Sequence, residues 1–355
     1  MTPATLSGRR PPATRLRIQS LTSLRFFAAF AVMLSHIRFT LPGLAGATGF
    51  DVLFFGVEFF FVLSGFVLTL RYAGGVRPLA EYYPRRLARV FPLHIATFLA
   101  WFLVFGVSWD APLVAMAPIA GANLLLIHTF MPGWHYTMSV NPVSWSLSAE
   151  AFFYVVFPFI VAVPRALTTA LAILTFTLIW LATGMDIGDR FPAFFELMPP
   201  IRLFEFCLGI LAGHGFLALR RHCLPVRLGT VFELAAIGAV IGSVWATRMV
   251  PDELGHPLAA PAFALAILVM AREEGWLSRA IAGSPLLVRL GAASFSLYMW
   301  HHMAMTLVGR TAFASDYPAL TAILLLPALA ALSILSWRWI EEPLARLFTA
   351  RLTTV

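Results

Sequence analysis

The sequence predicts an all-α, polytopic integral membrane protein, a helical bundle with about 10 transmembrane helices. Of its 355 residues, 60% are hydrophobic and only 12% are charged, and the mean hydropathy is +0.83. A soluble domain carries about 25% charged residues, roughly twice as many. Apolar runs that reach or approach the roughly 20 residues needed to cross a bilayer follow one another along the chain. Most of the chain is therefore expected to lie in lipid.

The apolar runs alternate with clusters of Arg. The runs cover about 21–38, 50–70, 91–108, 113–130, 148–163, 166–184, 200–219, 229–247, 257–271, 292–309 and 318–340. All 25 basic residues are Arg, and Arg-rich connections face the cytoplasm. Between the clusters that end at Arg89 and begin at Arg220, the chain must cross an even number of times, yet five runs lie there. One of these runs is therefore expected not to span.

The run at 113–130 is the one expected to be re-entrant. It contains Pro118, Gly121, Asn123 and His128, a composition typical of irregular backbone that lines a protein cavity at membrane depth. If this run is not counted as a crossing, ten crossings remain, and both termini are expected in the cytoplasm. No internal repeat of the kind found in many transporters is visible.

The domain organisation that follows is simple. Residues 1–20 form a basic cytoplasmic tail, 21–343 a single transmembrane domain, and 344–355 a short cytoplasmic tail. The first apolar run contains Arg25 and His36 and no small-residue cleavage site, which argues against a removable signal peptide. The two cysteines, Cys207 and Cys223, are too few for a disulfide framework or a zinc cluster, so no metal is expected. The charge pattern gives no indication of nucleic-acid binding.

The first two helices contain polar residues that are costly inside a membrane. Each charged group costs about 2.5–3.5 kcal/mol to insert, so each is a candidate functional residue. Arg25 and His36 are eleven residues apart, which places them on nearly the same helix face about 16 Å apart. Glu58, on the next helix, reaches a similar depth to His36. A His36–Glu58 pair would fix the imidazole tautomer and make His36 a general base. The alternative is a packing histidine beside a protonated or otherwise satisfied carboxyl group.

Arg86 and Arg89 are three residues apart at the cytoplasmic end of the third helix. Planar guanidinium groups bind phosphate through paired hydrogen bonds, so these residues are candidates for holding a phosphorylated donor such as coenzyme A. The alternative is that they only set the orientation of the helix and contact anionic lipid.

Three further motifs are candidates for acceptor binding or for lining a cavity. Trp145, Ser146 and Glu150 enter a helix with several polar groups close together, either as capping residues or as contacts for a hydroxylated acceptor. Arg202 and Glu205 form an i, i+3 pair, for which a structural role is slightly favoured. Near the C-terminal end, a polar stripe along one helix points into the bundle, whereas His302 is expected to point elsewhere. This stripe contains Ser294, Tyr298 and His301.

Together these motifs resemble acyltransferase family 3, the bacterial membrane O-acyltransferases that modify polysaccharides and other hydroxylated acceptors. The resemblance covers residues 21–343. It rests on the Arg25–His36 spacing and on four segments, 56–65, 86–89, 145–150 and 294–301. It implies that His36 is catalytic and Arg25 its essential companion, with Arg86 and Arg89 on the donor side. Two positions depart from the family pattern: Glu58 stands where Asp is frequent, and Met303 where Pro is common.

The expected function is therefore transfer of an acyl group, most simply acetyl, from acyl-CoA to a hydroxyl group. The expected acceptor is a carbohydrate or glycolipid, and the expected location is the bacterial inner membrane. Direct transfer and an acyl-histidine intermediate are both open. No Gly-x-Ser-x-Gly elbow is present, which argues against a serine acyl-enzyme, and no appended esterase-like domain is expected. The alternatives are a transporter or flippase that uses the buried charges as a proton path, and a sensor or scaffold without chemistry.

Overall fold

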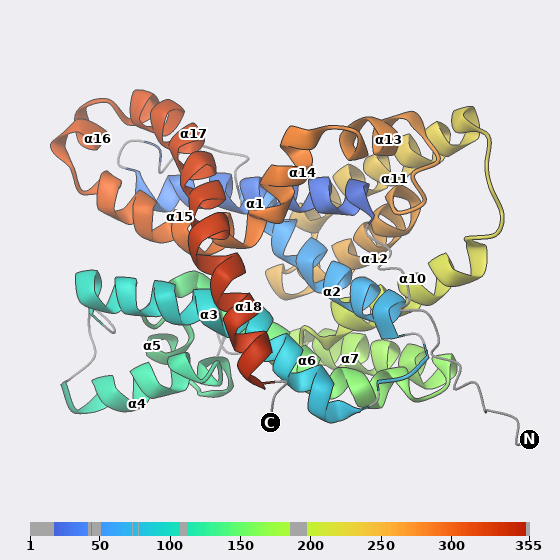
Figure 1. Ribbon diagram of the computed structural model, residues 1–355, viewed down its shortest axis with the longest axis horizontal. Coiled ribbons are helices and arrows are strands. Elements are labelled where there is room, and N and C mark those ends of the chain that lie inside the picture. Colours follow the sequence, from blue (N-terminus) through green and yellow to red (C-terminus); the bar gives the residue numbers. More distant parts are fainter. Residues whose placement is uncertain are drawn as a thin grey trace, which may run out of the picture.

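The computed structural model describes residues 18–41, 44, 51–72, 74–76, 78–106, 113–184 and 197–352. Every regular element in these ranges is a helix, as the sequence predicts (Figure 1). The helices of the first half are α1 (Gln19–Thr40), η1 (Asp51–Phe55), α2 (Gly56–Tyr72), α3 (Leu79–Phe105), α4 (Leu113–Leu124), η2 (His128–Phe130), α5 (Trp134–Thr137), η3 (Pro142–Ser144), α6 (Trp145–Val161) and α7 (Arg165–Gly184).

The second half of the chain continues the bundle. Its helices are α10 (Leu203–Leu219), α11 (Val226–Ala246), η4 (Thr247–Met249), α12 (Asp252–Met270), α13 (Trp276–Ala282), α14 (Pro285–Ala292), α15 (Ser294–Gly309), α16 (Ala312–Asp316), α17 (Pro318–Ser336), η5 (Trp337–Glu341) and α18 (Glu342–Leu352). Many of their large apolar side chains are exposed on the surface, which suits a bundle surrounded by lipid rather than by water.

Seven of the described helical segments are long and apolar enough to cross a membrane. They contain α1, α2, α3, α6, α7, α11 and α17. α10 and α12 supply two shorter apolar segments, 203–219 and 254–270. With the 16-residue α15, these are the ten helices that the sequence predicts for the bundle.

The run at 113–130, expected to be re-entrant, does not form one continuous helix. α4 ends at Leu124, and irregular backbone with φ of 58° at Leu126 follows. Polar side chains of the protein hold this backbone: Asn123 Nδ2 donates to the carbonyl oxygen of Ser139 over 2.8 Å, and Ser148 Oγ donates to that of Leu126 over 2.6 Å. Asn123 and Ser148 are fully buried. The segment is thus a short helix followed by irregular backbone that buried polar side chains hold, while Leu125 and Ile127 are exposed.

Small residues bring α2 and α10 into close contact. A Cβ atom added to Gly65 would lie 2.2 Å from the carbonyl oxygen of Phe206, and one added to Gly209 would lie 2.0 Å from that of Val62. Gly213 lies one turn further along the same face of α10, against α2. This is the small-residue packing typical of membrane helices, because lipid supplies no hydrophobic force to join them.

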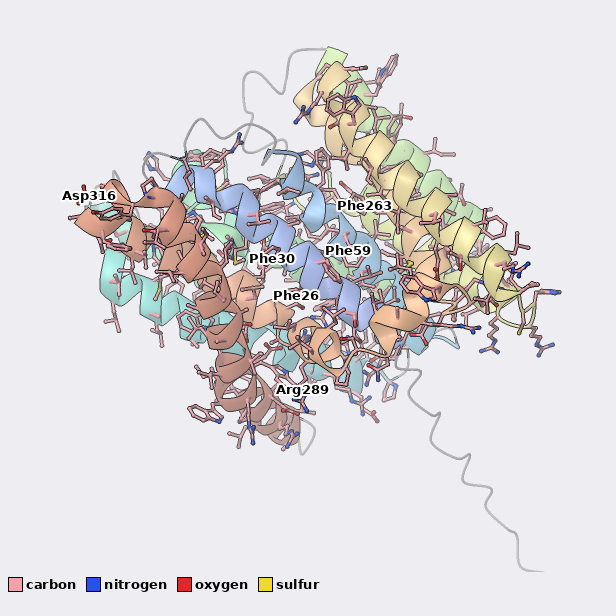
Figure 2. The ribbon with its side chains drawn as sticks, turned by 90° about the horizontal axis from the view of Figure 1, so that it is seen from above. Phe26, Phe30, Phe59, Phe263, Arg289 and Asp316 are labelled. Atoms are coloured by element: carbon pink, nitrogen blue, oxygen red, sulfur yellow. The ribbon has the colours of Figure 1, made fainter. Side chains whose placement is uncertain are left out.

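α1 runs through the middle of the bundle, where Phe26 and Phe30 are seen along it in Figure 2. α14 and α15 cross it closely. The backbone carbonyl of Thr22 would lie 1.8 Å from a Cβ at Gly291, and that of Thr40 would lie 1.9 Å from a Cβ at Gly309. The two ends of α1 are therefore fixed against the C-terminal half of the chain.

The last helices form one long rod that passes across α3 (Figure 1). α17 continues through the π-helical turn η5 directly into α18, so the residues from 344 to 352, expected to be a tail, are helical. A π-turn inserts one extra residue into a helix and shifts the direction of the side chains beyond it. Glu341 ends this turn and is buried.

Candidate functional site

Arg side chains gather around one cavity between α1, α2, α3, α6 and α15. The cavity has a volume of about 310 Å³ and is here called the arginine cavity. Apolar side chains of α2 line part of it. Its polar lining residues are Arg25, Ser64, Arg71, Arg86, Arg89, Ser146, Glu150, Tyr154, Ser294 and Tyr298. The two sequence-predicted Arg motifs, far apart in the chain, therefore meet around one space.

Arg86 reaches the arginine cavity through a group of aromatic rings. Its guanidinium carbon lies 5.9 Å from the ring centres of Tyr72 and Tyr82 and 5.7 Å from that of Tyr154. Cation–π attraction at these distances holds the group in place without neutralising its charge. The charge thus stays available to an anion in the cavity.

Arg89 is held by a carboxylate behind the cavity wall. Its Nη1 lies 2.5 Å from Glu341 Oε1, and the other Glu341 oxygen accepts a hydrogen bond from Ser296 Oγ over 2.8 Å. Because Glu341 is fixed from two sides by the π-turn and by Ser296, it fixes Arg89 in turn. Glu341 does not line the cavity, so the remaining Arg89 nitrogens are free to face it.

Ser146 and Tyr298 meet at the end of the arginine cavity away from Arg86. Ser146 Oγ lies 2.8 Å from the Tyr298 hydroxyl, which also donates to the carbonyl oxygen of Val143 over 3.2 Å. Glu150 accepts a hydrogen bond from Tyr154 on the same helix. Ser146 and Glu150 of the motif at 145–150 and Ser294 and Tyr298 of the α15 stripe therefore line one cavity, whereas Trp145 and His301 do not line it.

Three histidines cluster one turn beyond Tyr298. The ring centre of His36 lies 5.0 Å from that of His301 and 5.3 Å from that of His302. His301 is fully buried, while His36 and His302 are partly buried. His302 was expected to point elsewhere, and this prediction is wrong: α15 packs so close to α1 that two adjacent positions of α15 both reach His36.

Backbone carbonyls fix the tautomers of two of these histidines. His36 Nδ1 lies 2.8 Å from the carbonyl oxygen of Val32, and His301 Nδ1 lies 2.7 Å from that of Tyr298. A carbonyl oxygen can only accept, so both Nδ1 atoms carry hydrogen and both Nε2 atoms are lone-pair acceptors. His301 Nε2 lies 3.4 Å from His36 Nδ1. It therefore shares the His36 N–H with Val32 and leaves His36 Nε2 as the basic nitrogen.

Glu58 is not the partner of His36. Its Oε1 lies 2.7 Å from His256 Nδ1 and 3.6 Å from Arg202 Nη1, and Arg202 Nη1 also contacts Glu205 Oε1 at 3.1 Å. The prediction of a His36–Glu58 pair is therefore wrong. Glu58 lies in the first turn of α2, and its carboxylate faces Arg202, just before α10, and His256 of α12 instead of His36 of α1.

The Glu58 cluster, defined as Glu58, Arg202, Glu205 and His256, is separated from His36 by an aromatic ring. The ring centre of Phe54 lies 6.0 Å from that of His36 and 6.1 Å from that of His256. The i, i+3 pair of Arg202 and Glu205 forms as predicted, and both side chains are almost fully buried. This self-neutralising pair is joined by a second carboxylate and a histidine, neither of which lies near it in the sequence.

Sequence reasoning missed three residues of this region. His256 and Glu341 lie near the ends of apolar helices beside other charged residues, Asp252 and Glu253 in one case and Glu342 in the other, so their own polarity was the only available signal. Tyr154 lies one turn after Glu150, at a spacing that predicts contact between the two side chains. Among the described residues, no group of three or more His, Cys, Asp or Glu side chains has an arrangement suited to a metal ion.

Comparisons with known proteins show the family of the chain. A family model described as an acyltransferase domain matches residues 18–340. The chain is similar to acyltransferase MdmB of Streptomyces mycarofaciens, at 29% identity over 96% of this chain and 95% of the relative. It is 26% identical to nodulation protein 10 of Rhizobium leguminosarum bv. viciae, over 92% of this chain and 93% of the relative. O-acetyltransferase OatA of Staphylococcus aureus is 24% identical over 93% of this chain but only 57% of its own length. No solved structure matches the chain significantly.

Proposed function

Because the chain belongs to this acyltransferase domain family, we propose that it is a membrane-bound O-acyltransferase with His36 as its general base. The donor is acyl-CoA, most simply acetyl-CoA, and the acceptor is a hydroxyl group of a sugar, glycan or glycolipid. The single observation that carries this proposal is the position of His36: Val32 and His301 accept from its Nδ1–H and leave Nε2 as the basic nitrogen, one turn beyond a cavity lined by four Arg side chains.

The arginine cavity suits a donor with phosphate groups. Arg25, Arg71, Arg86 and Arg89 all line it, whereas Glu150 is its one carboxylate among the lining residues. Guanidinium groups bind phosphate oxygens through paired, charge-assisted hydrogen bonds. We assign Arg86 and Arg89 to the phosphates, and Arg25, which lines the same cavity, to the same phosphate-bearing part of the donor. The apolar side chains of α2 then accompany the pantetheine arm toward Tyr298.

His36 performs the chemistry in this proposal. Its Nε2 accepts the proton of the acceptor hydroxyl while the oxygen forms a bond to the thioester carbonyl carbon. The carbon–sulfur bond then breaks, and the coenzyme A thiolate takes the proton from the imidazolium. The positive charge that His36 carries in between is stabilised by hydrogen bonds from Nδ1–H to Val32 and His301. His301 thus has the orienting role that the sequence assigned to Glu58.

Ser146 and Tyr298 mark the point where donor and His36 meet. Their hydroxyl groups lie 2.8 Å apart and face the arginine cavity. Because the Tyr298 hydroxyl donates its hydrogen to the Val143 carbonyl, Tyr298 positions Ser146, and the Ser146 hydroxyl is the group that can donate a hydrogen bond to a developing oxyanion. Trp145 contacts the guanidinium group of Arg202 at 5.7 Å, so it connects this point with the Glu58 cluster.

The donor assignment is tested by two neighbouring substitutions. Arg86→Ala is expected to raise the KM for acetyl-CoA about tenfold or more with a smaller effect on kcat, because a contact to the bound donor is lost. Arg85→Ala is the matched control: Arg85 pairs on the exposed surface with Glu81 and does not line the cavity. The measurement is release of the coenzyme A thiol by the purified protein. Equal KM values for the two variants would return Arg86 to a lipid-contacting or structural role.

The protein is expected to act in the bacterial inner membrane with both termini in the cytoplasm. This placement puts the arginine cavity on the cytoplasmic side, where acyl-CoA is available. The Arg-rich segments near that cavity support the orientation, because such segments remain in the cytoplasm.

A further inference from the structure

Trp145 belongs to a predicted cavity-lining motif, but it does not line the arginine cavity that its neighbour Ser146 reaches. It is the first residue of α6, and it is only 3% exposed. The arginine cavity therefore gives no role to this large ring. The ring contacts of Trp145 lead instead toward His36.

Phe54, on the short helix η1, contacts both Trp145 and His36. The Phe54 and Trp145 rings are stacked at an angle of 17°, with their centres 6.2 Å apart. The centre of the Phe54 ring also lies 6.0 Å from that of His36. Aromatic pairs with centres about 4.5–7 Å apart attract each other, most favourably in offset-stacked or edge-to-face arrangements. His36 is thus contacted by Phe54 from η1 and by His301 and His302 from α15.

Two neighbours fix the Trp145 ring. The guanidinium carbon of Arg202 lies over it, 5.7 Å from the ring centre, and the Phe61 ring lies at 83° to it with the centres 5.9 Å apart. Among aromatic side chains, Trp forms the strongest cation–π contacts. Arg202 is itself held by Glu205 and Glu58, whose carboxylate oxygens lie 3.1 and 3.6 Å from its Nη1. The Glu58 cluster therefore anchors one of the two stacked rings.

The same cluster also contacts the second ring, through His256. The centre of the Phe54 ring lies 6.1 Å from that of His256, and His256 Nδ1 lies 2.7 Å from Glu58 Oε1. Directly after η1, Gly56 packs on α1 so closely that an added Cβ would lie 2.5 Å from the carbonyl oxygen of Ala28. Phe54 is therefore held between the Glu58 cluster and the helix that carries His36.

We infer that Trp145 and Phe54 are positioning residues for His36, and that the Glu58 cluster holds these two rings in place. The hydrogen bond from Nδ1–H to Val32 fixes one atom of the imidazole ring, whereas the tilt of the ring depends on what packs against it. Proton transfer from the acceptor hydroxyl requires Nε2 to keep its direction, because catalysis is sensitive to small displacements of the reacting groups. This inference rests on the proposed function. It gives a role to a buried cluster of charges that does not line the arginine cavity.

The first test separates positioning from donor binding. Trp145→Leu is expected to lower kcat about tenfold or more, because His36 loses its fixed direction. The KM for acetyl-CoA is expected to change less than about twofold, because Trp145 does not line the arginine cavity. Trp145→Phe keeps an aromatic ring against Phe54 and is expected to retain most of the wild-type kcat. Initial rates are measured as release of the coenzyme A thiol, with methyl β-D-glucopyranoside as the probe acceptor.

Phe216→Leu is the matched control for the loss of a buried aromatic ring. Phe216 is 6% exposed and contacts Phe66, which lies eight positions, or about 12 Å, beyond Glu58 along α2. This variant is expected to have the wild-type kcat, and both Leu variants are expected to remain monodisperse in detergent. A wild-type kcat for Trp145→Leu, or the same loss of kcat in Trp145→Leu and Phe216→Leu, would overturn the inference.

The second test asks whether Trp145 acts through His36. Trp145→Leu is combined with His36→Ala, and the slow residual formation of the probe ester is measured by mass spectrometry. Residues that act through one another have non-additive effects. The double variant is therefore expected to form ester within about twofold of the rate of His36→Ala alone. If Trp145→Leu lowers the residual rate by the same factor as it lowers the wild-type rate, Trp145 acts independently of His36 and the inference is wrong.

The outcomes also distinguish this inference from the function on which it rests. If His36→Ala forms ester far more slowly than the wild-type protein but Trp145→Leu has the wild-type kcat, the positioning role is wrong and the proposed function stands. If the wild-type protein consumes no acetyl-CoA in the presence of the probe, the proposed function is contradicted and the inference falls with it.

Discussion

We predict that the positive charge of Arg202 contributes strongly to the stability of the folded bundle. Its side chain is 3% exposed, and it is the cation next to Glu58 and Glu205, which are 0% and 1% exposed. Removing one partner of a buried ion pair leaves an uncompensated charge and costs about 3–5 kcal/mol. Arg202→Met is therefore expected to lower the free energy of unfolding by about that amount, since two carboxylates depend on it. The assay is urea unfolding of the full-length protein in detergent micelles.

A double variant provides the critical comparison for this prediction. Arg202→Met combined with Glu205→Gln removes Arg202 together with the charge of its nearer carboxylate partner and leaves Glu58 with His256, so it is expected to recover a large part of the lost stability. Arg346→Met is the control, because Arg346 and Glu342 pair on the exposed surface and contribute at most about 1 kcal/mol. If Arg202→Met loses no more stability than Arg346→Met, or if the double variant is no more stable than Arg202→Met, the electrostatic reasoning is refuted.

Two further predictions concern helix packing and the donor side. Gly209→Leu is expected to prevent normal folding, because even a Cβ at this position would lie 2.0 Å from the Val62 carbonyl oxygen. The measurement is loss of a monodisperse species in detergent. Gly238→Leu is the control and should fold normally, because a Cβ at Gly238 would enter open space. Glu341→Gln is expected to raise the KM for acetyl-CoA severalfold, because Arg89 loses the carboxylate that fixes it, whereas Glu342→Gln should leave this KM unchanged. Equal KM values for these two variants would contradict the role of Glu341.

The helices and their order were predictable because membrane insertion leaves a strong signal in the sequence. Apolar length identifies a crossing, and the even number of crossings between Arg clusters predicted correctly that 113–130 does not form one continuous spanning helix. Apolar length and Arg clusters are both read from position along the chain. The same position gives the expected depth of each residue in the membrane. The common side of Arg86 and Arg89 on α3 followed from their spacing of three residues, and both line the arginine cavity.

The rotation of each helix about its own axis was not predictable in this way. Glu58 was expected to face His36, but it faces His256 and Arg202 instead. Which helices become neighbours depends on close contacts such as that of Gly65 with Gly209, and a single sequence does not show which small residues will meet. The direction of the Glu341 side chain depends on a π-turn, and the extra residue of this turn has no clear signal in the sequence.

The central claim is that His36 is the base for acyl transfer, and one comparison tests it most directly. Purified wild-type protein and His36→Ala are supplied with acetyl-CoA that carries an isotope label in its acetyl group, and labelled ester on methyl β-D-glucopyranoside is measured by mass spectrometry. We expect His36→Ala to retain its folded, monodisperse state in detergent and to form product about 10²–10⁴-fold more slowly. A folded His36→Ala variant that forms labelled ester at the wild-type rate would contradict the claim.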